Sequence, residues 1–249
     1  MVANTISVFE AFQNKGPQLT LNEVIEICGI SKASTYRILE TLRFRGYLAK
    51  SAQGRYRLTY KLFDIAVVVL GHTPLRKVAL PFMEELQGTS GETVNLGIFE
   101  EDHVVYTDVL ESSRRLRIVP AVGSHGPFHA TALGKAILAW LPSETVSQLL
   151  RDNGLKRFTP TTITSKPAFL GDLQSIRGRG YAIDNEEENP GCICVAAAVF
   201  DYRKEVVGAI SISAPATRLS PGRVARLGTE VKRVALEISH KLGYTASRS

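Results

Sequence analysis

The chain has 249 residues, of which 44% are hydrophobic, and it carries a formal net charge of +6. This composition supports a folded core, and the length favours about two domains. No apolar run reaches roughly 18 residues, which excludes a membrane-spanning helix, and no signal peptide is evident at the start. Three cysteines, Cys28, Cys192 and Cys194, are too few for a disulfide framework, so we expect a reduced, cytoplasmic setting.

Positive charge is concentrated near the start of the chain. Residues 1–72 hold nine Lys and Arg against five Asp and Glu, a net of +4, whereas residues 73–249 hold 21 against 19, a net of +2. A small basic domain on a nearly neutral larger one is typical of a nucleic-acid-binding protein with a separate sensor. An ordinary soluble surface would also give +4, so charge alone does not decide.

The first predicted elements are two short helices. Residues 4–12 have apolar side chains three apart, which predicts an amphipathic helix. Thr20 and Glu23 form a capping box for a second helix, whose apolar positions follow the spacing i, i+3, i+4 and i+7. Gly29 ends this helix because glycine accepts a positive φ after the C-cap.

A third helix begins after a short turn, with Ser31 as N-cap, and runs to about Arg45. Tyr36, Leu39 and Leu42 are expected on its inner face. Two helices joined by a short glycine-containing turn, the second with small and basic groups at its start, predict a helix-turn-helix. The side chains expected to face outward are those of Lys32, Ala33, Ser34, Thr35, Arg37 and Thr41.

Residues 46–58 alternate as a hairpin with a turn near Gly54, which completes a winged helix-turn-helix. Basic side chains on this wing suit contact with a phosphate backbone. The predicted DNA-contacting residues are Thr20, Ser31, Lys32, Ala33, Ser34, Thr35, Arg37, Lys50, Arg55 and Arg57.

A linker helix is expected within residues 59–73, and the pattern then changes to mixed helices and strands. We therefore predict domains at 1–58 and 74–249, and an α+β fold for the second. Helices are expected at 75–86, 131–141 (with Ala132, Ala136, Ile137 and Trp140 packed), 143–150, 166–179 and 224–241. Strands are expected within 91–110 and at 116–119, 192–200 and 205–213.

The last two strands predict a small-molecule site. A tight turn at residues 201–204 pairs Cys194 with Ser211 and Cys192 with Ser213. Since residues i and i+2 share one face of a strand, these four small polar groups form one patch. Weak hydrogen-bond donors of this kind suit a small carboxylate or keto acid. Alternatively, the serines are ordinary strand residues and the cysteines are small buried hydrophobes.

Several stretches in order resemble the IclR family of bacterial transcriptional regulators over nearly the whole chain. They are residues 19–21 (LTL) with 29–39 (GISKASTYRIL), 46–47 (GY) with 54–58 (GRYRL), 129–136 (HATALGKA), 180–187 (GYAIDNEE), 194–197 (CVAA) and 209–213 (AISIS). The resemblance implies a winged helix-turn-helix, a linker helix and a GAF-like effector-binding domain. It also implies homodimers or dimers of dimers that control a catabolic operon, and it adds Ala132, Leu133 and Asp184 to the effector site.

Enzymatic alternatives have weaker support. Cys192, Cys194 and His129 lack the usual spacing of zinc ligands, and no cofactor motif occurs. A Cys194–His129–Asp184 nucleophile is conceivable, but no adjacent oxyanion-hole signature accompanies it. The acidic stretch 185–190 is expected to be a solvated loop. We therefore expect a regulator of double-stranded operator DNA, controlled by a small organic acid, and not an enzyme. The alternative is a ligand-binding or thiol-dependent enzyme domain whose helix-turn-helix mediates protein contacts.

Overall fold

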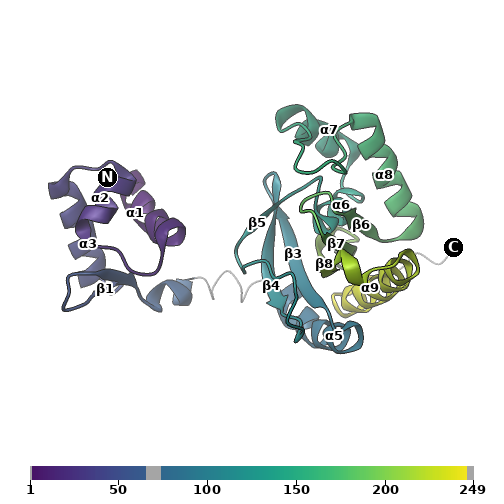
Figure 1. Ribbon diagram of the computed structural model, residues 1–249, viewed down its shortest axis with the longest axis horizontal. Coiled ribbons are helices and arrows are strands. Elements are labelled where there is room, and N and C mark those ends of the chain that lie inside the picture. Colours follow the sequence, from purple (N-terminus) through teal and green to yellow (C-terminus); the bar gives the residue numbers. More distant parts are fainter. Residues whose placement is uncertain (1, 66–73, 246–249) are drawn as a thin grey trace. The chain divides into compact units, whose positions relative to one another are not determined.

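The computed structural model describes residues 2–65 and 74–245. The chain divides into two compact units, Met1–Thr73 and Pro74–Ser249. The two units are presented separately below, and Figure 1 labels their helices and strands.

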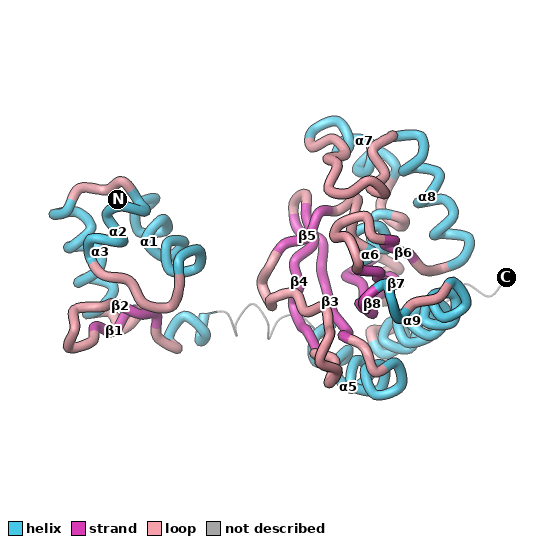
Figure 2. Tube along the Cα trace, in the orientation of Figure 1, coloured by secondary structure: helices cyan, strands magenta, loops and turns pink. Residues whose placement is uncertain are grey.

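The first unit packs three helices beside a two-stranded antiparallel ribbon (Figure 2). Its core is an apolar cluster to which every element contributes, including Val8, Val24, Leu39 and Tyr56. The ribbon pairs Leu48 with Leu58 and closes the open side of the helices, as expected for a winged helix. The elements are α1 (Val2–Lys15), α2 (Leu21–Cys28), α3 (Lys32–Phe44), β1 (Leu48–Lys50) and β2 (Tyr56–Leu58).

The local signals that bound α2 and α3 are confirmed. The Glu23 N–H donates to Thr20 Oγ1 at 3.3 Å and the Thr20 N–H donates to Glu23 Oε2 at 2.6 Å, which is the predicted capping box. Gly29 ends α2 with a φ of 63°, and the Ser34 N–H donates to the Ser31 hydroxyl at the start of α3. These caps fix the short turn between the two helices.

The inner face of α3 differs from the prediction. Thr35 was expected to face outward, but it is fully buried, and its hydroxyl donates to the carbonyl oxygens of Ile30 and Ser31. Tyr36 was expected inside, but it is 49% exposed. The buried stripe is therefore Thr35, Ile38, Leu39 and Leu42, the regular i, i+3, i+4, i+7 spacing of a helix. A threonine whose hydroxyl bonds the preceding turn packs as a small apolar residue.

Within the predicted linker, residues 61–65 are helical, residues 59–60 precede this helix, and residues 66–73 lie outside the described residues. The second unit then begins with α5 (Pro74–Ser90).

The second unit is built on a six-stranded antiparallel sheet of order β5-β4-β3-β8-β7-β6. The predicted hairpin within 91–110 and the predicted strand at 192–200 are confirmed. The strands are β3 (Thr93–Glu100), β4 (His103–Leu110), β5 (His125–Pro127), β6 (Ala182–Asn185), β7 (Cys192–Phe200) and β8 (Val206–Pro215).

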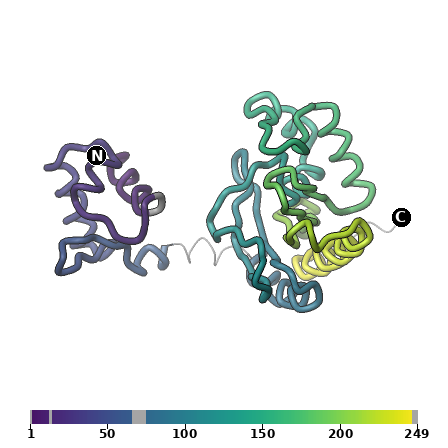
Figure 3. The backbone as a smooth tube through the Cα atoms, in the orientation of Figure 1, coloured from purple at the N-terminus to yellow at the C-terminus, as the bar shows by residue number. Residues whose placement is uncertain are grey.

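Helices cover both faces of this sheet. On one face, α5 and α9 enclose an apolar core that includes Val94, Val195 and Ile212. These helices are the first and last of the unit, yet they lie side by side (Figure 3). The other face carries a second core beneath the remaining helices (Figure 1). The helices are α6 (Ala132–Leu138), α7 (Ser143–Asp152), α8 (Lys166–Arg179), the 3₁₀ turn η1 (Ala216–Arg218) and α9 (Pro221–Lys241).

Three local predictions in this unit are wrong. Residues 116–119 form no strand; the sheet instead continues through β5. Trp140 follows the end of α6 and is 43% exposed, because α6 stops at Leu138. The acidic stretch 185–190 is not a solvated loop throughout, because Glu187 is buried.

The register of β7 on β8 also differs from the prediction. Cys194 pairs with Ser213 instead of Ser211, and Cys192 pairs with Pro215. The hairpin has a three-residue loop that ends at Lys204, whose φ is 65°, and a bulge follows between Val199 and Phe200. The register therefore moves by two residues in total. Because side chains alternate with period two, the cysteines and serines keep their shared face.

Candidate functional site

The start of α3 presents most of its predicted DNA-contacting side chains to solvent. Ser31, Lys32, Ala33 and Arg37 are exposed, and Ser34 is half-buried. An exposed helix start that carries two cations and the small side chains of Ala33 and Ser34 is suited to enter the DNA major groove. Thr35 is excluded from this surface by its burial.

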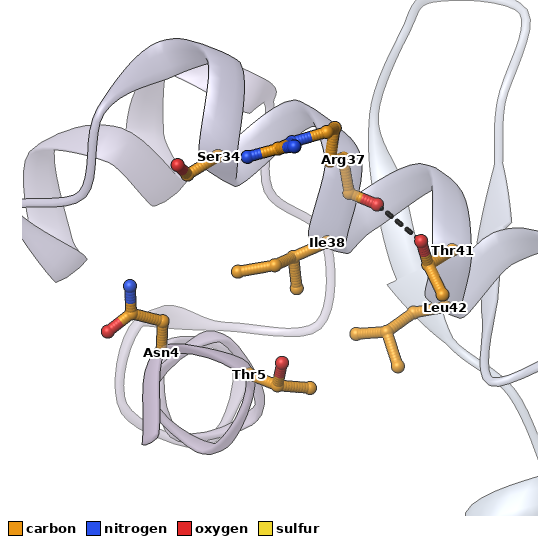
Figure 4. Close-up of a pocket in the computed structure, with 7 residues that line it drawn as sticks. All are labelled: Asn4, Thr5, Ser34, Arg37, Ile38, Thr41 and Leu42. Atoms are coloured by element: carbon orange, nitrogen blue, oxygen red, sulfur yellow. Dashed lines mark hydrogen bonds between the residues drawn. The ribbon is translucent and has the colours of Figure 1, made fainter. Parts of the chain in front are cut away.

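A groove of about 360 Å³ lies between α1 and α3, directly below this surface. Figure 4 shows Ser34, Arg37 and Ile38 of α3 on one side and Asn4 and Thr5 of α1 on the other. Sequence reasoning missed Asn4, because nothing in residues 4–12 indicates that this helix would pack beside α3. It also missed Tyr36, which shares the exposed surface of α3.

The basic side chains of the wing differ in whether they form ion pairs with acidic side chains. Arg57 is exposed and makes no ion pair within residues 2–65. Arg55 Nη1 lies 3.4 Å from Glu23 Oε2, and Lys50 lies 3.9 Å from Glu40 Oε1 and over the Tyr56 ring. Ion pairs offset part of the charge that Arg55 and Lys50 offer to a phosphate, so Arg57 is the strongest candidate on the wing. Thr20 is half-buried, and its hydroxyl accepts the capping bond from Glu23.

The second unit gathers the predicted polar patch on the face of the sheet that α6 covers. Cys194 Sγ lies 3.1 Å from Ser213 Oγ and 3.5 Å from Cys192 Sγ. Ser211 and Ser213 both accept hydrogen bonds from Asn95 Nδ2, at 3.1 and 3.0 Å. Asn95 is fully buried, and its Oδ1 has no hydrogen-bond partner within the described chain. Sequence reasoning missed Asn95, for which the available signal is a lone amide inside an apolar strand.

Asp184 joins this patch from the neighbouring strand, since it pairs with Cys194. Its side chain is buried and accepts a hydrogen bond from the Glu187 N–H at 2.7 Å. Burial raises the pKa of the Asp184 carboxyl to about 7, and the nearby charges of Glu187 and Glu188 act in the same direction. A carboxyl group with this pKa donates a hydrogen bond for much of the time near neutral pH.

Tyr106 and Glu188 extend this patch. We call the patch, together with Asp184, Tyr106 and Glu188, the polar wall. Burial raises the pKa of the Tyr106 hydroxyl, with further contributions from Glu188 and Cys194, so this phenol stays neutral and lies near both groups. Burial alone raises the pKa of Glu188. The pKa of the Cys194 thiol is also raised, first by its interaction with Cys192 and then by burial. The Tyr106 phenol and the Cys194 thiol of the wall are therefore neutral hydrogen-bonding groups, and burial disfavours the ionised forms of Asp184 and Glu188.

Ala132 and Leu133, the remaining predicted effector contacts, occupy the first turn of α6 and are buried. The Thr131 hydroxyl caps this helix by accepting a hydrogen bond from the Gly134 N–H at 3.1 Å. The N–H groups of Ala132 and Leu133 stand in the first turn, where N–H groups have no acceptor within the helix. A Cβ atom at Gly134 would overlap the Phe128 carbonyl oxygen. Only glycine lets the helix start approach this closely.

His129 and Cys194, two members of the conceivable nucleophile, have separate partners. His129 Nε2 lies 2.8 Å from the Lys156 carbonyl oxygen and its ring packs against Phe128, Phe158 and Phe169, whereas Cys194 contacts Cys192 and Ser213. No group of three or more metal-ligating side chains gathers among residues 2–65 and 74–245. Within those same ranges, no helix is long and apolar enough to cross a membrane.

A winged helix-turn-helix joined to a domain with a buried polar sheet face defines a DNA-binding regulator with an effector domain. The chain matches the IclR helix-turn-helix domain over residues 1–52 and the bacterial transcriptional regulator IclR C-terminal domain over residues 67–240. It therefore belongs to the IclR family of bacterial transcriptional regulators.

Individual relatives agree over the full length. The transcriptional regulator KdgR of Escherichia coli is 35% identical over 98% of this chain and 94% of its own length. XynR of the same organism is 30% identical, with 98% of each chain covered. The crystal structure of Thermotoga maritima IclR superposes with a TM-score of 0.85 at 31% identity, over 98% of this chain and 100% of that one.

Proposed function

We propose that this regulator binds a roughly palindromic operator of a catabolic operon and that a small organic acid in the second unit controls its affinity. The observation that carries the proposal is that one chain has both an exposed cationic surface, on α3, and a buried polar wall, on the sheet of the second unit. A protein that binds operator DNA works in the cytoplasm.

The DNA contacts follow from charge and exposure. Lys32 and Arg37 neutralise phosphates or bond guanine edges, Ala33 allows close approach, and Ser31 and Ser34 bond base edges or phosphates. Arg57 contacts the backbone from the wing, supported by Lys50, Arg55 and Thr20.

The effector contacts follow from the wall. A carboxylate accepts hydrogen bonds from protonated Asp184 and from the amides of Ala132 and Leu133. Cys192, Cys194, Ser211 and Ser213 line the patch beside it. A ligand hydroxyl group satisfies Asn95 Oδ1, so a hydroxylated organic acid fits better than an apolar one.

We also propose that the protein works as a homodimer or a dimer of dimers, since two half-sites require two recognition helices. Large apolar side chains on the first unit support this, because Phe44, Tyr60 and Phe63 are 88%, 89% and 58% exposed. Light scattering of the full chain measures the assembly size.

The DNA part is tested by selecting a binding sequence from random DNA with the full-length protein. Affinity for the selected duplex should fall steeply with salt, and Lys32→Ala or Arg37→Ala should each reduce the slope of log affinity against log salt by about 1. Arg151→Ala removes an exposed charge on α7 and serves as the control. A slope of log affinity against log salt near zero would contradict DNA binding through phosphates. It would favour the alternative in which the first unit mediates protein contacts.

The effector part is tested by thermal shift with a panel of keto, hydroxy and aromatic acids. An acid that raises the melting temperature should also change affinity for the selected duplex, and Ser213→Ala should weaken both effects. An acid that acts equally on the wild type and on Ser213→Ala binds elsewhere and contradicts the assigned site.

A further inference from the structure

A second groove, of about 500 Å³, lies along β6, the edge strand of the sheet. Ile183 and Ile193, which line it, alternate with Asp184 and Cys194 along their strands and point to the opposite face of the sheet. Glu187, which also lines the groove, borders the polar wall, because its N–H donates to Asp184 Oδ1. In Figure 1, β6 lies beside α8, and α9 lies below them. We call this hollow the β6-edge groove. Charged side chains of Lys135, Asp172, Arg179 and Glu187 line it, together with apolar ones that include Leu219 and Val224.

A row of alternating charges crosses this groove. Arg179 Nη2 lies 3.4 Å from Asp172 Oδ1, Lys135 Nζ lies 3.0 Å from Asp172 Oδ2, and the same Nζ lies 2.5 Å from Glu187 Oε1. The side chains of Lys135 and Glu187 are only 1% and 6% exposed. Two cations and two carboxylates cancel, so the row has no net charge and offers no general attraction to simple anions or cations.

The buried end of the row has an unsatisfied acceptor. Glu187 Oε2 is shielded from solvent and has no hydrogen-bond partner in the described part of the chain. Asp172 Oδ2 is buried as well and lies near Lys135 without hydrogen-bonding geometry. Buried carboxylate oxygens without donors are rare and destabilising, so an N–H or O–H donor bound at this end of the groove would be stabilising.

The other end offers a donor. Arg179 is anchored by its Nε–H, which donates to the Tyr181 carbonyl oxygen at 2.6 Å, and by its stacking on the Tyr181 ring. Its Nη1 makes no hydrogen bond to any described residue, and its side chain is 30% exposed. A guanidinium held in place with free N–H groups is suited to bind a carboxylate.

We propose that the β6-edge groove binds a free amino acid with a branched aliphatic side chain. The ammonium group donates to Glu187 Oε2, the carboxylate accepts from Arg179, and the side chain packs on Ile193, Leu219 and Val224. A zwitterion carries both a donor for Glu187 Oε2 and an acceptor for Arg179 Nη1, whereas a simple carboxylic acid lacks the donor and a simple amine lacks the acceptor. This proposal does not rest on the organic-acid site.

The test uses isothermal titration calorimetry on the full-length protein with three probes. They are L-leucine, 4-methylpentanoate, which lacks the ammonium group, and 3-methylbutylamine, which lacks the carboxylate. We expect L-leucine to bind at least about tenfold more tightly than either analogue, because each analogue forfeits a charge-assisted hydrogen bond.

Variants locate the binding. Ala225→Trp places a bulky ring at the exposed rim of the groove and should abolish leucine binding, whereas Thr229→Trp, one turn along α9 and outside the lining, should leave it unchanged. Glu187→Gln should weaken leucine binding at least about tenfold and leave the affinity for 4-methylpentanoate unchanged. Leucine binding that survives Ala225→Trp, equal affinity for 4-methylpentanoate and leucine, or no heat with leucine at millimolar concentration would each overturn the proposal.

Discussion

Replacing Asp184 with Asn should change how the stability of the second unit depends on pH. Burial is the main reason that the pKa of Asp184 is raised from 3.8 to about 7. Glu187 and Glu188 raise this pKa further, whereas the Glu187 N–H and Lys135 lower it. An acid with a higher pKa in the folded state binds more protons when folded. Its contribution to stability is therefore greatest below pH 3.8 and is lost as pH rises to about 7.

The size of the stability change follows from the difference between the folded and unfolded pKa values of Asp184. About three pH units correspond to about 4 kcal/mol, an upper limit because local relaxation and water entry reduce the penalty, so we expect about 2–4 kcal/mol. The amide in the Asp184→Asn variant has the same shape as the carboxyl, keeps an acceptor for the Glu187 N–H and carries no charge. Asp184→Asn should therefore match the wild type near pH 4 and exceed its stability by about 2–4 kcal/mol at pH 8.

Urea unfolding followed by circular dichroism between pH 4 and pH 8 measures this difference. Asp152→Asn, which neutralises an exposed carboxylate at the end of α7, is the matched control and should leave the pH dependence unchanged. Glu187 and Glu188 remain in the variant and retain their own smaller slopes. If wild type and Asp184→Asn lose stability in parallel as pH rises, the buried carboxyl of Asp184 is not the group that titrates.

Three further predictions separate structural from contact roles. Arg57→Ala should reduce the salt slope of DNA affinity by about 1, and Arg55→Ala by less because Glu23 already pairs with Arg55; equal effects would contradict the difference in pairing. Thr35→Val should lower the free energy of unfolding by about 1 kcal/mol in urea titration while leaving DNA affinity within about twofold, and a larger loss of affinity would restore Thr35 as a contact. Gly134→Ala should destabilise by about 2–3 kcal/mol because its Cβ meets the Phe128 carbonyl, whereas Gly171→Ala on α8 meets nothing within 4 Å and should be neutral or stabilising in the same urea titration.

Elements with local signals were predictable from the sequence. The predicted bounds of α8, residues 166–179, are confirmed; Pro167 stands at its start, and Gly180 follows its end in the left-handed conformation. The capping box of α2 and the bounds of β7 were likewise confirmed. In each case the determining interactions lie within a few residues along the chain.

Features that depend on distant partners were not predictable. Asn95 donates a hydrogen bond to Ser211, which lies more than a hundred residues later in the chain. The two residues are neighbours only because β3 pairs with β8 in the sheet. Glu187 looked like a solvated acid because its partner Lys135 lies on another element. The register error arose from a bulge beside Gly208, which was not used as a signal, and from the left-handed Lys204, where no glycine marks the conformation. The prediction that the cysteines of β7 and the serines of β8 share one face of the sheet remained correct, because the register moved by two residues, an even number.

Glu187 connects the two proposed ligand sites through different atoms. Its N–H is bonded to Asp184 Oδ1 on the polar wall, while its side chain holds Lys135 of α6 at the β6-edge groove. A carboxylate ligand that keeps Asp184 protonated makes its oxygen a weaker acceptor for the Glu187 N–H. An ammonium group on Glu187 Oε2 competes with Lys135 and so loosens α6, whose first turn supplies Ala132 and Leu133. If both ligands bind as proposed, we expect each to change the affinity of the other, and by the same factor.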